Sequence, residues 1–302
     1  MKTQLTLSVA KLNLEVETFI SSYLKEKSLE TRGTYERALR EFQRYFAVAK
    51  DWFKFRTEDI DQYKKYLMEE RKLSQVSVST YLTSLRRLID YFVAQGLLTE
   101  NTAKKIKGNK RPERHTAGVL TEAEAQKLVV MIPTEKMQDL RDLITVRLML
   151  ECAASEHELI KASIEDLKKM SSSRYILFVQ AKGKKSKDET LDVPAELVSL
   201  IQTYLARRKK ALPSSPLLAS HSHRISEARL TTRAMRYRVN HWLKEAGVLR
   251  DNISPHSLRH TAAKLWLERD KLSLEEVKTK MRHGMMATTK IYTTPPPEAS
   301  IS

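Results

Sequence analysis

The sequence predicts a two-domain protein that is mainly helical, with a small β-hairpin or sheet in the second domain. Three observations lead to this fold class. The chain has 302 residues, a length typical of about two domains. Apolar residues recur at helical spacing through most of the first hundred residues. One later stretch, residues 172–194, has the pattern of two extended segments around a lysine-rich turn.

We expect the first domain, residues 11–103, to be a compact bundle of four amphipathic helices. The first covers residues 14–24, and the third covers residues 57–68 with Thr57 as its N-cap. Gly96 supplies a natural stop after the fourth. Apolar stripes mark the other two helices: Tyr35, Leu39, Phe42 and Phe46 in the second, and Val78, Tyr81, Leu82, Leu85, Leu88, Ile89 and Phe92 in the fourth.

A basic linker, residues 104–117, separates this bundle from the second domain, residues 118–302. It opens with KKIKGNKRPER, which has no apolar periodicity and contains a glycine and a proline. The second domain begins with a capping box, because Thr121 is followed three residues later by Glu124. Further helices are predicted at residues 138–151, 195–212, 231–246 and 257–268, and the hairpin lies between the first two of these.

The charge balance favours a polyanionic partner. Lys and Arg total 54 against 37 Asp and Glu, which gives a formal net charge of +17. No apolar run is long enough to span a membrane. The single cysteine, Cys152, lies in an apolar segment and is predicted to be a core residue, so we expect a reducing, cytoplasmic location. His221 and His223 have no neighbouring cysteine and are expected in a solvated loop rather than a metal site.

The most informative motifs lie near the carboxyl end. Residues 254–263 read SPHSLRHTAA, with His256 and Arg259 in an H-x-x-R spacing. Residues 281–293 read MRHGMMATTKIYT, with Tyr292 nine residues after His283. The hairpin segment AKGKKSKDETLDVP carries Lys182 near its tip. These motifs, in this order and behind a helical domain and a basic linker, resemble the tyrosine recombinase (phage integrase) family over nearly the whole chain.

The resemblance implies a phosphoryl-transfer site whose nucleophile is Tyr292. Arg259 would hold the scissile phosphate through its fork of N–H donors, and His283 would donate to the same phosphate. His256 would act as base or phosphate donor, and Lys182 would give a proton to the departing DNA oxygen. The 3′-phosphotyrosine conserves the ester energy, so no cofactor and no metal are required. His260 also matches the family, and we expect it to make a buried structural hydrogen bond.

One position departs from the family pattern. The family's first catalytic arginine falls on Ser155 within CAASEHEL, and serine supplies no cation. Ser155 and Glu158 instead have capping-box spacing. Either a nearby cation, Arg147 or Lys161, reaches the phosphate and activity survives, or the protein is weakened and acts mainly by binding DNA. We favour the first alternative, because the other five predicted catalytic residues are present.

The resemblance also implies architecture and partners. A core-binding (SAM-like) domain and a catalytic domain would form a clamp around double-stranded DNA, and four copies would assemble on two sites. Because no further domain precedes the bundle, we expect an Xer-like or resolvase-like enzyme, or a small mobile-element integrase. A type IB topoisomerase is the remaining alternative. The predicted DNA contacts are Arg37, Arg40, Arg44, Arg86, Arg87, Lys104, Lys105, Lys107, Lys110 and Arg111.

Overall fold

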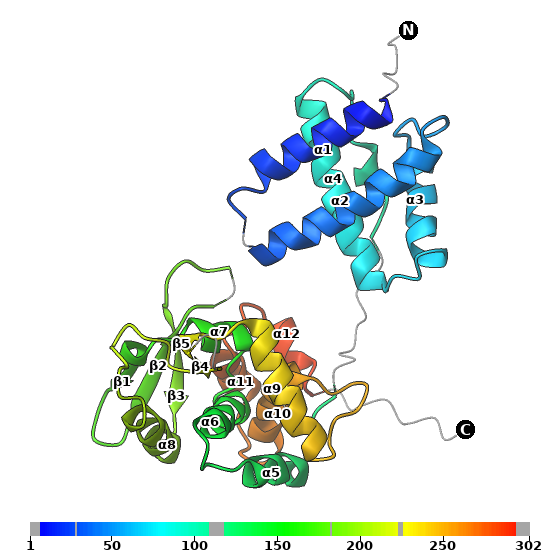
Figure 1. The fold of residues 1–302 in the computed structure, drawn as a ribbon. Coiled ribbons are helices and arrows are strands. Elements are labelled where there is room, and N and C mark those ends of the chain that lie inside the picture. Colours follow the sequence, from blue (N-terminus) through cyan, green and yellow to red (C-terminus); the bar gives the residue numbers. More distant parts are fainter. Residues whose placement is uncertain (1–6, 28, 109–117, 182, 223–225, 294–302) are drawn as a thin grey trace. The chain divides into compact units, whose positions relative to one another are not determined.

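The structure, a computed structural model, describes residues 7–27, 29–108, 118–181, 183–222 and 226–293. Its contacts divide the chain into two compact units, residues 1–113 and 114–302 (Figure 1). Each unit has its own hydrophobic core. No helix among the described residues is long and apolar enough to cross a membrane.

The first unit contains the four predicted helices, and a short 3₁₀ turn, η1, follows them. Its elements are α1 (Val9–Tyr23), α2 (Leu29–Ala49), α3 (Thr57–Glu69), α4 (Gln75–Ala94) and η1 (Thr102–Lys104). The residues of the predicted stripes face the core, where Phe42, Phe46 and Phe92 are almost fully buried. The start of α3 differs from the prediction, because Thr57 lies inside the helix. The Asp59 carboxylate caps it by accepting the backbone N–H of Lys54 and of Arg56.

The second unit is mainly helical and contains two small antiparallel sheets. Its helices are α5 (Glu122–Met131), α6 (Met137–Glu151), α7 (Glu156–Lys161), α8 (Ala195–Ala206), α9 (Thr232–Glu245), α10 (Pro255–Glu268), α11 (Leu274–Met281) and α12 (Met286–Lys290), with a 3₁₀ turn, η2, at Ile164–Asp166. The strands are β1 (Leu167–Lys169), β2 (Tyr175–Val179), β3 (Glu189–Val193), β4 (Ala219–His221) and β5 (Ser226–Arg229). The predicted hairpin is confirmed as β2 and β3, and β1 adds a third strand beside β2.

Two predictions for this unit are wrong. The helix expected over residues 195–212 ends at Ala206. His221 is in strand β4, where its Nε2 lies 2.8 Å from the Tyr204 hydroxyl, and it is not in a solvated loop. The strands β4 and β5 are short and carry little apolar alternation, which explains why the sequence pattern did not indicate them. His223 lies outside the described residues.

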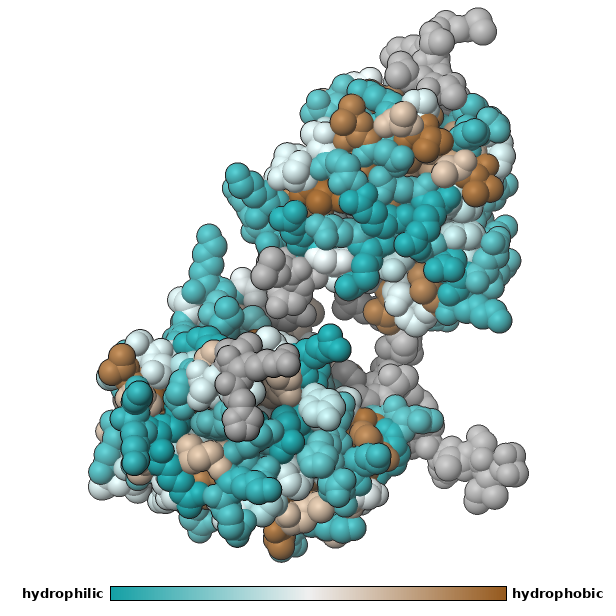
Figure 2. Space-filling view, viewed as in Figure 1, coloured by the Kyte–Doolittle hydropathy of each residue, from teal (hydrophilic) through white to brown (hydrophobic). Residues whose placement is uncertain are grey.

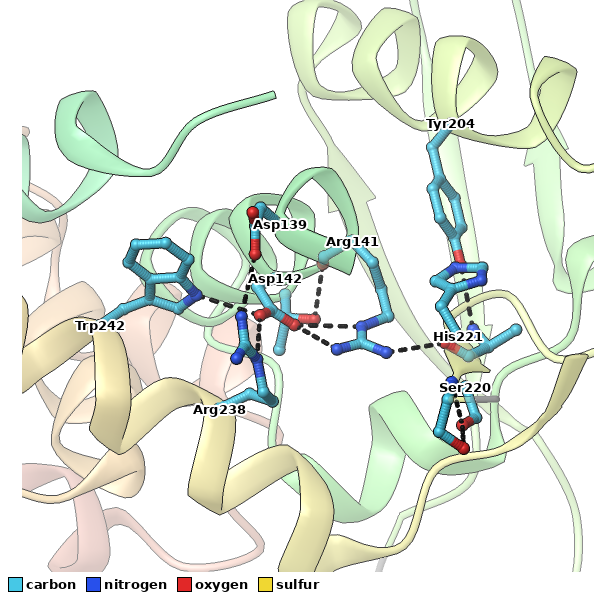
Figure 3. A network of polar contacts seen from close by, with 11 residues as sticks. Asp139, Arg141, Asp142, Tyr204, Ser220, His221, Arg238 and Trp242 are labelled. Atoms are coloured by element: carbon cyan, nitrogen blue, oxygen red, sulfur yellow. Dashed lines mark hydrogen bonds and ion pairs between the residues drawn. The ribbon is translucent and has the colours of Figure 1, made fainter. Parts of the chain in front are cut away.

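A buried polar network fixes α9 against α6 (Figure 3). The Asp142 carboxylate accepts hydrogen bonds from Arg141, Arg238 and the Trp242 indole. Arg238 also donates to Asp139 at 2.9 Å, and Arg141 donates to the carbonyl of Ala219 at the start of β4. Two guanidinium groups therefore meet two carboxylates, and the charge of the network is balanced.

Candidate active site

Tyr292 lies just after α12, in contact with a small apolar cluster formed mainly by α10 and α11. Its hydroxyl is 2.6 Å from Nδ1 of His260. Burial raises the pKa of Tyr292 to about 12, although the charge of Arg259 opposes that rise. The phenol therefore keeps its proton at neutral pH, and it can act as a nucleophile only when a base removes that proton.

Helix α10 carries His256, Arg259 and His260 in its first two turns, and the last two interact with this tyrosine. Pro255 occupies the first turn, where its missing N–H costs no hydrogen bond, and the helix begins there. His256 and His260 are one turn apart, with ring centroids 4.9 Å apart, and the His260 ring is 5.5 Å from the Tyr292 ring. His260 thus makes a hydrogen bond that is only partly buried, and its partner is the predicted nucleophile itself.

The side chain of His256 is directed to a different group, the carboxylate of Glu156. The His256 Nδ1 lies 3.5 Å from Glu156 Oε2, and Arg236 donates to the other carboxylate oxygen at 2.9 Å. Burial alone would raise the pKa of Glu156, but the hydrogen bonds from His256 and Arg236 lower it to about 2. The His256 ring is therefore held by a carboxylate at the start of α7.

The ring of His283 also lies next to the tyrosine ring. The two rings are nearly parallel, at an interplanar angle of 12° and a centroid distance of 6.2 Å. The Nδ1 atom of His283 lies 3.0 Å from the hydroxyl of Thr289 on α12, and this contact holds the ring in place. His256, Arg259, His283 and Tyr292 are therefore gathered in one place, whereas Lys182 lies outside the described residues.

Ser155 is the N-cap of α7, as the capping-box spacing predicts. Its Oγ accepts the Glu158 N–H at 3.3 Å, and the Glu158 carboxylate accepts the Ser155 N–H at 2.6 Å. The same carboxylate receives Arg259 NH1 at 3.4 Å. Arg259 also donates to the carbonyl oxygens of Ala153 and Met281. The predicted phosphate-binding arginine is therefore held beside the position that lacks the family's first arginine.

A second guanidinium at this position was not predicted. Arg282 Nε donates to Glu158 Oε1 at 2.9 Å, and Arg282 NH2 donates to Glu158 Oε2 at 3.0 Å. Sequence reasoning passed over Arg282 although it directly precedes His283. Its partner Glu158 is 124 positions away, so no local spacing could have indicated the pair.

The two cations proposed from sequence to replace the missing arginine do not lie at this position. Arg147 binds Glu151 at 2.5 Å on its own helix, and it lines a groove with Asp192 and Trp266 that does not include Tyr292. Lys161 is exposed at the end of α7 opposite Ser155. Residues of α5, α8 and α10 line the groove that contains Arg147, and sequence spacing alone did not fix that orientation.

The predicted DNA contacts of the first unit are mostly engaged in surface ion pairs. Arg40 pairs with Glu17, Arg44 with Glu41, Lys104 with Asp90 and Lys105 with Glu100. Arg37, Arg87 and Lys107 are also described, whereas Lys110 and Arg111 lie outside the described residues. Such exposed pairs are weak and can exchange partners when a phosphate approaches.

Arg86, another predicted DNA contact, is directed toward the backbone of the predicted linker. Its guanidinium is half-buried and donates to the carbonyl oxygens of Ala103, at 3.0 Å, and Ile106, at 2.7 Å. Burial lowers the pKa of Arg86, as expected for a charged group turned toward the protein. Two N–H groups of Arg86 therefore anchor the start of the predicted linker to α4.

Comparison with known protein families shows to which family the chain belongs. A model of the phage integrase family matches residues 118–298, and a model of the phage integrase SAM-like domain matches residues 15–108. The chain belongs to the phage integrase family of tyrosine recombinases. Members of this family are site-specific recombinases that catalyse DNA cleavage and rejoining. The matches do not favour the binding-only and topoisomerase alternatives.

Several named tyrosine recombinases are similar to the chain over most of its length. It is 27% identical to the tyrosine recombinase XerC of Chlamydia pneumoniae over 79% of the chain and 73% of that protein. It is 30% identical to the tyrosine recombinase XerA of Pyrococcus horikoshii over 76% of the chain and 73% of the relative. The solved structure of XerH bound to its difH substrate after cleavage has the same fold, with a TM-score of 0.74 and 20% identity over 95% of this chain and 81% of that one.

Proposed function

We propose that Tyr292 is the nucleophile of this recombinase and that Arg259, His256 and His283 bind the scissile phosphate. The observation that carries the proposal is the convergence of these side chains around one phenol. The ring centroids of His260, on α10, and His283, in the loop between α11 and α12, lie 5.5 Å and 6.2 Å from that of Tyr292. Arg259 is close enough that its charge lowers the pKa of Tyr292 against the effect of burial.

The proposed reaction is an in-line exchange of one phosphate ester for another. The Tyr292 hydroxyl oxygen attacks phosphorus, a bond from phosphorus to that oxygen forms, and the bond from phosphorus to the 5′ oxygen of DNA breaks. The 5′ oxygen takes a proton as it leaves, and Lys182 remains our sequence-based choice for the donor. Guanidinium and imidazolium donors stabilise the charge that develops on the phosphate oxygens. The reverse attack by a 5′ hydroxyl restores DNA without an external energy source.

His260 is the base that we propose for the phenol proton. Its Nδ1 is within hydrogen-bond reach of the Tyr292 hydroxyl, at 2.6 Å. Geometry is the first requirement for a general base, and this contact meets it. Of the two roles that the sequence left open for His256, base or phosphate donor, this proposal leaves it that of phosphate donor.

We further propose that double-stranded DNA is the partner, that unit 1 is the core-binding domain and that unit 2 is the catalytic domain. The solved structures of XerH with difH and of lambda integrase with a core site are DNA complexes with the same fold. The net charge of +17 supports binding to phosphates. The visible face of both units is largely hydrophilic, with scattered apolar patches (Figure 2). A tetramer on two DNA sites is the assembly we propose from the family resemblance.

A trapped covalent intermediate tests the proposal. A bound duplex is first selected from a random pool with the Tyr292→Phe protein, which keeps the binding surface. A nick beside the scissile phosphate then lets the short product diffuse away, so that the protein–DNA adduct accumulates. We expect an adduct from the wild type and none from Tyr292→Phe, with binding of the two proteins alike. Tight binding without any adduct from the wild type would favour a DNA-binding role alone.

A further inference from the structure

Arg282 is placed where a second phosphate-binding cation is missing from the sequence pattern. Its NH2 donates to the carbonyl of Ala153 at 2.8 Å, two residues before Ser155, and its fork holds Glu158, three residues after it. The guanidinium therefore spans the segment that holds Ser155. Its side chain is only 5% exposed, which excludes a loosely held surface arginine.

The backbone is shaped to make this placement. Arg282 follows α11 in the left-handed region, with φ 58° and ψ 38°, and Ala153 also has a positive φ of 48°. Side chains other than glycine pay a steric cost in this region, and the position after a helix is one that glycine commonly occupies. An arginine at this position accepts the steric strain that a glycine would avoid. Its side chain turns back toward α7, where it contacts Glu158.

Arg282 and Arg259 share acceptors, so their charges lie side by side. Both guanidinium groups donate to the Ala153 carbonyl, and both contact Glu158. Burial, together with the charge of Arg282, lowers the pKa of Arg259 to about 10. Two cations thus share the one carboxylate of Glu158. The nearby carboxylate of Glu156 contacts Arg236 and His256 instead. An arriving anion would neutralise the remaining positive charge.

We propose that Arg282 supplies the second guanidinium on the scissile phosphate and so replaces the cation that Ser155 does not provide. The inference rests on the proposed function of Tyr292. Arg282 transfers no proton and forms no bond in the reaction. Its N–H groups stabilise the non-bridging oxygens as charge develops on them, beside the donors of Arg259.

The test measures the rate of adduct formation on the nicked duplex selected above. Arg282→Ala should slow the rate by about 10²–10³-fold, the loss typical of one oxyanion donor. Arg282→Lys should fall in between, because it keeps the charge and loses the fork. Arg147→Ala is the matched control, since its guanidinium is bound to Glu151 elsewhere, and it should cleave like the wild type. The double variant Ser155→Arg/Arg282→Gly places an arginine at the position where the family pattern has one. It should recover much of the cleavage rate lost in Arg282→Ala.

A neutral phosphate separates chemistry from folding. A methylphosphonate at the scissile position carries no negative charge. The rate of its cleavage should therefore depend much less on a cation than the rate for the natural diester does. The ratio of wild-type to Arg282→Lys or Arg282→Ala rates should therefore shrink on that duplex, whereas a folding defect would affect both duplexes alike. Equal ratios on the two duplexes, or wild-type cleavage by Arg282→Ala, would overturn the role of Arg282 and leave that of Tyr292 standing. No adduct from the wild type would instead overturn both.

Discussion

Two pairs of arginines in the second unit differ in how their charge is balanced. Arg141 and Arg238 meet two carboxylates, those of Asp139 and Asp142, in the network between α6 and α9 (Figure 3). Arg259 and Arg282 share the single carboxylate of Glu158. The balanced pair requires no additional anion, and it holds α6 and α9 together. The unbalanced pair lies near a partly buried phenol and a histidine, as expected for a site that binds an anion.

The largest effect should come from the base beside the unbalanced pair. His260→Ala should slow adduct formation at pH 7 by about 10²–10⁴-fold, because it removes the acceptor of the Tyr292 proton. The pKa of Tyr292 is about 12, so the variant's rate should rise with pH as hydroxide takes over that role. Rate measurements from pH 6 to 10 check this. A His260→Ala variant with the pH profile of the wild type would instead assign the base to another group.

Asp142→Asn turns the balanced network into an unbalanced one. Arg141 and Arg238 would then face Asp139 alone, and no anion replaces the missing charge. We expect a loss of about 3–5 kcal/mol in the free energy of unfolding, because a buried charge is left uncompensated. Urea denaturation measures it. Unchanged stability would show that charge balance does not hold α6 against α9.

Arg259→Ala should have the opposite profile. The rate of adduct formation should fall by about 10²–10³-fold, while stability should fall less than in Asp142→Asn, because one of two like charges is removed. Paired measurements of cleavage and urea midpoint check both halves. A variant that loses stability but cleaves normally would place Arg259 with the structural network.

The smallest effect concerns the carboxylate beside His256. The pKa of Glu156 is about 2 in the folded protein, well below its ordinary value of 4.5. Its ionised form therefore adds stability that is fully present above pH 4.5 and is lost as the pH falls toward 2. Glu156→Gln should cost about 1 kcal/mol at pH 7, because both partners of Glu156 are half exposed to solvent. The difference from wild type should shrink below pH 4.5; a constant difference down to pH 2 would contradict this.

Much of the fold follows from local pattern, and the site follows only in part. The bundle helices and the hairpin were predictable because apolar spacing decides which face is buried, as in the stripe of Phe42 and Phe46. The Ser155 cap was predictable because its partner, Glu158, is three residues away. The roles of Arg282, Arg86 and His221 were not, because their partners lie far along the chain or on another element. Local spacing could not supply those contacts.

The most direct measurement identifies the residue that carries the DNA. The trapped adduct would be digested with trypsin and nuclease, and the nucleotide located by mass spectrometry. Our account predicts a 3′-phosphate linked to the hydroxyl oxygen of Tyr292, in wild type and in slow Arg282→Ala adducts alike. A nucleotide on any other residue, or cut DNA without a protein link, would contradict it.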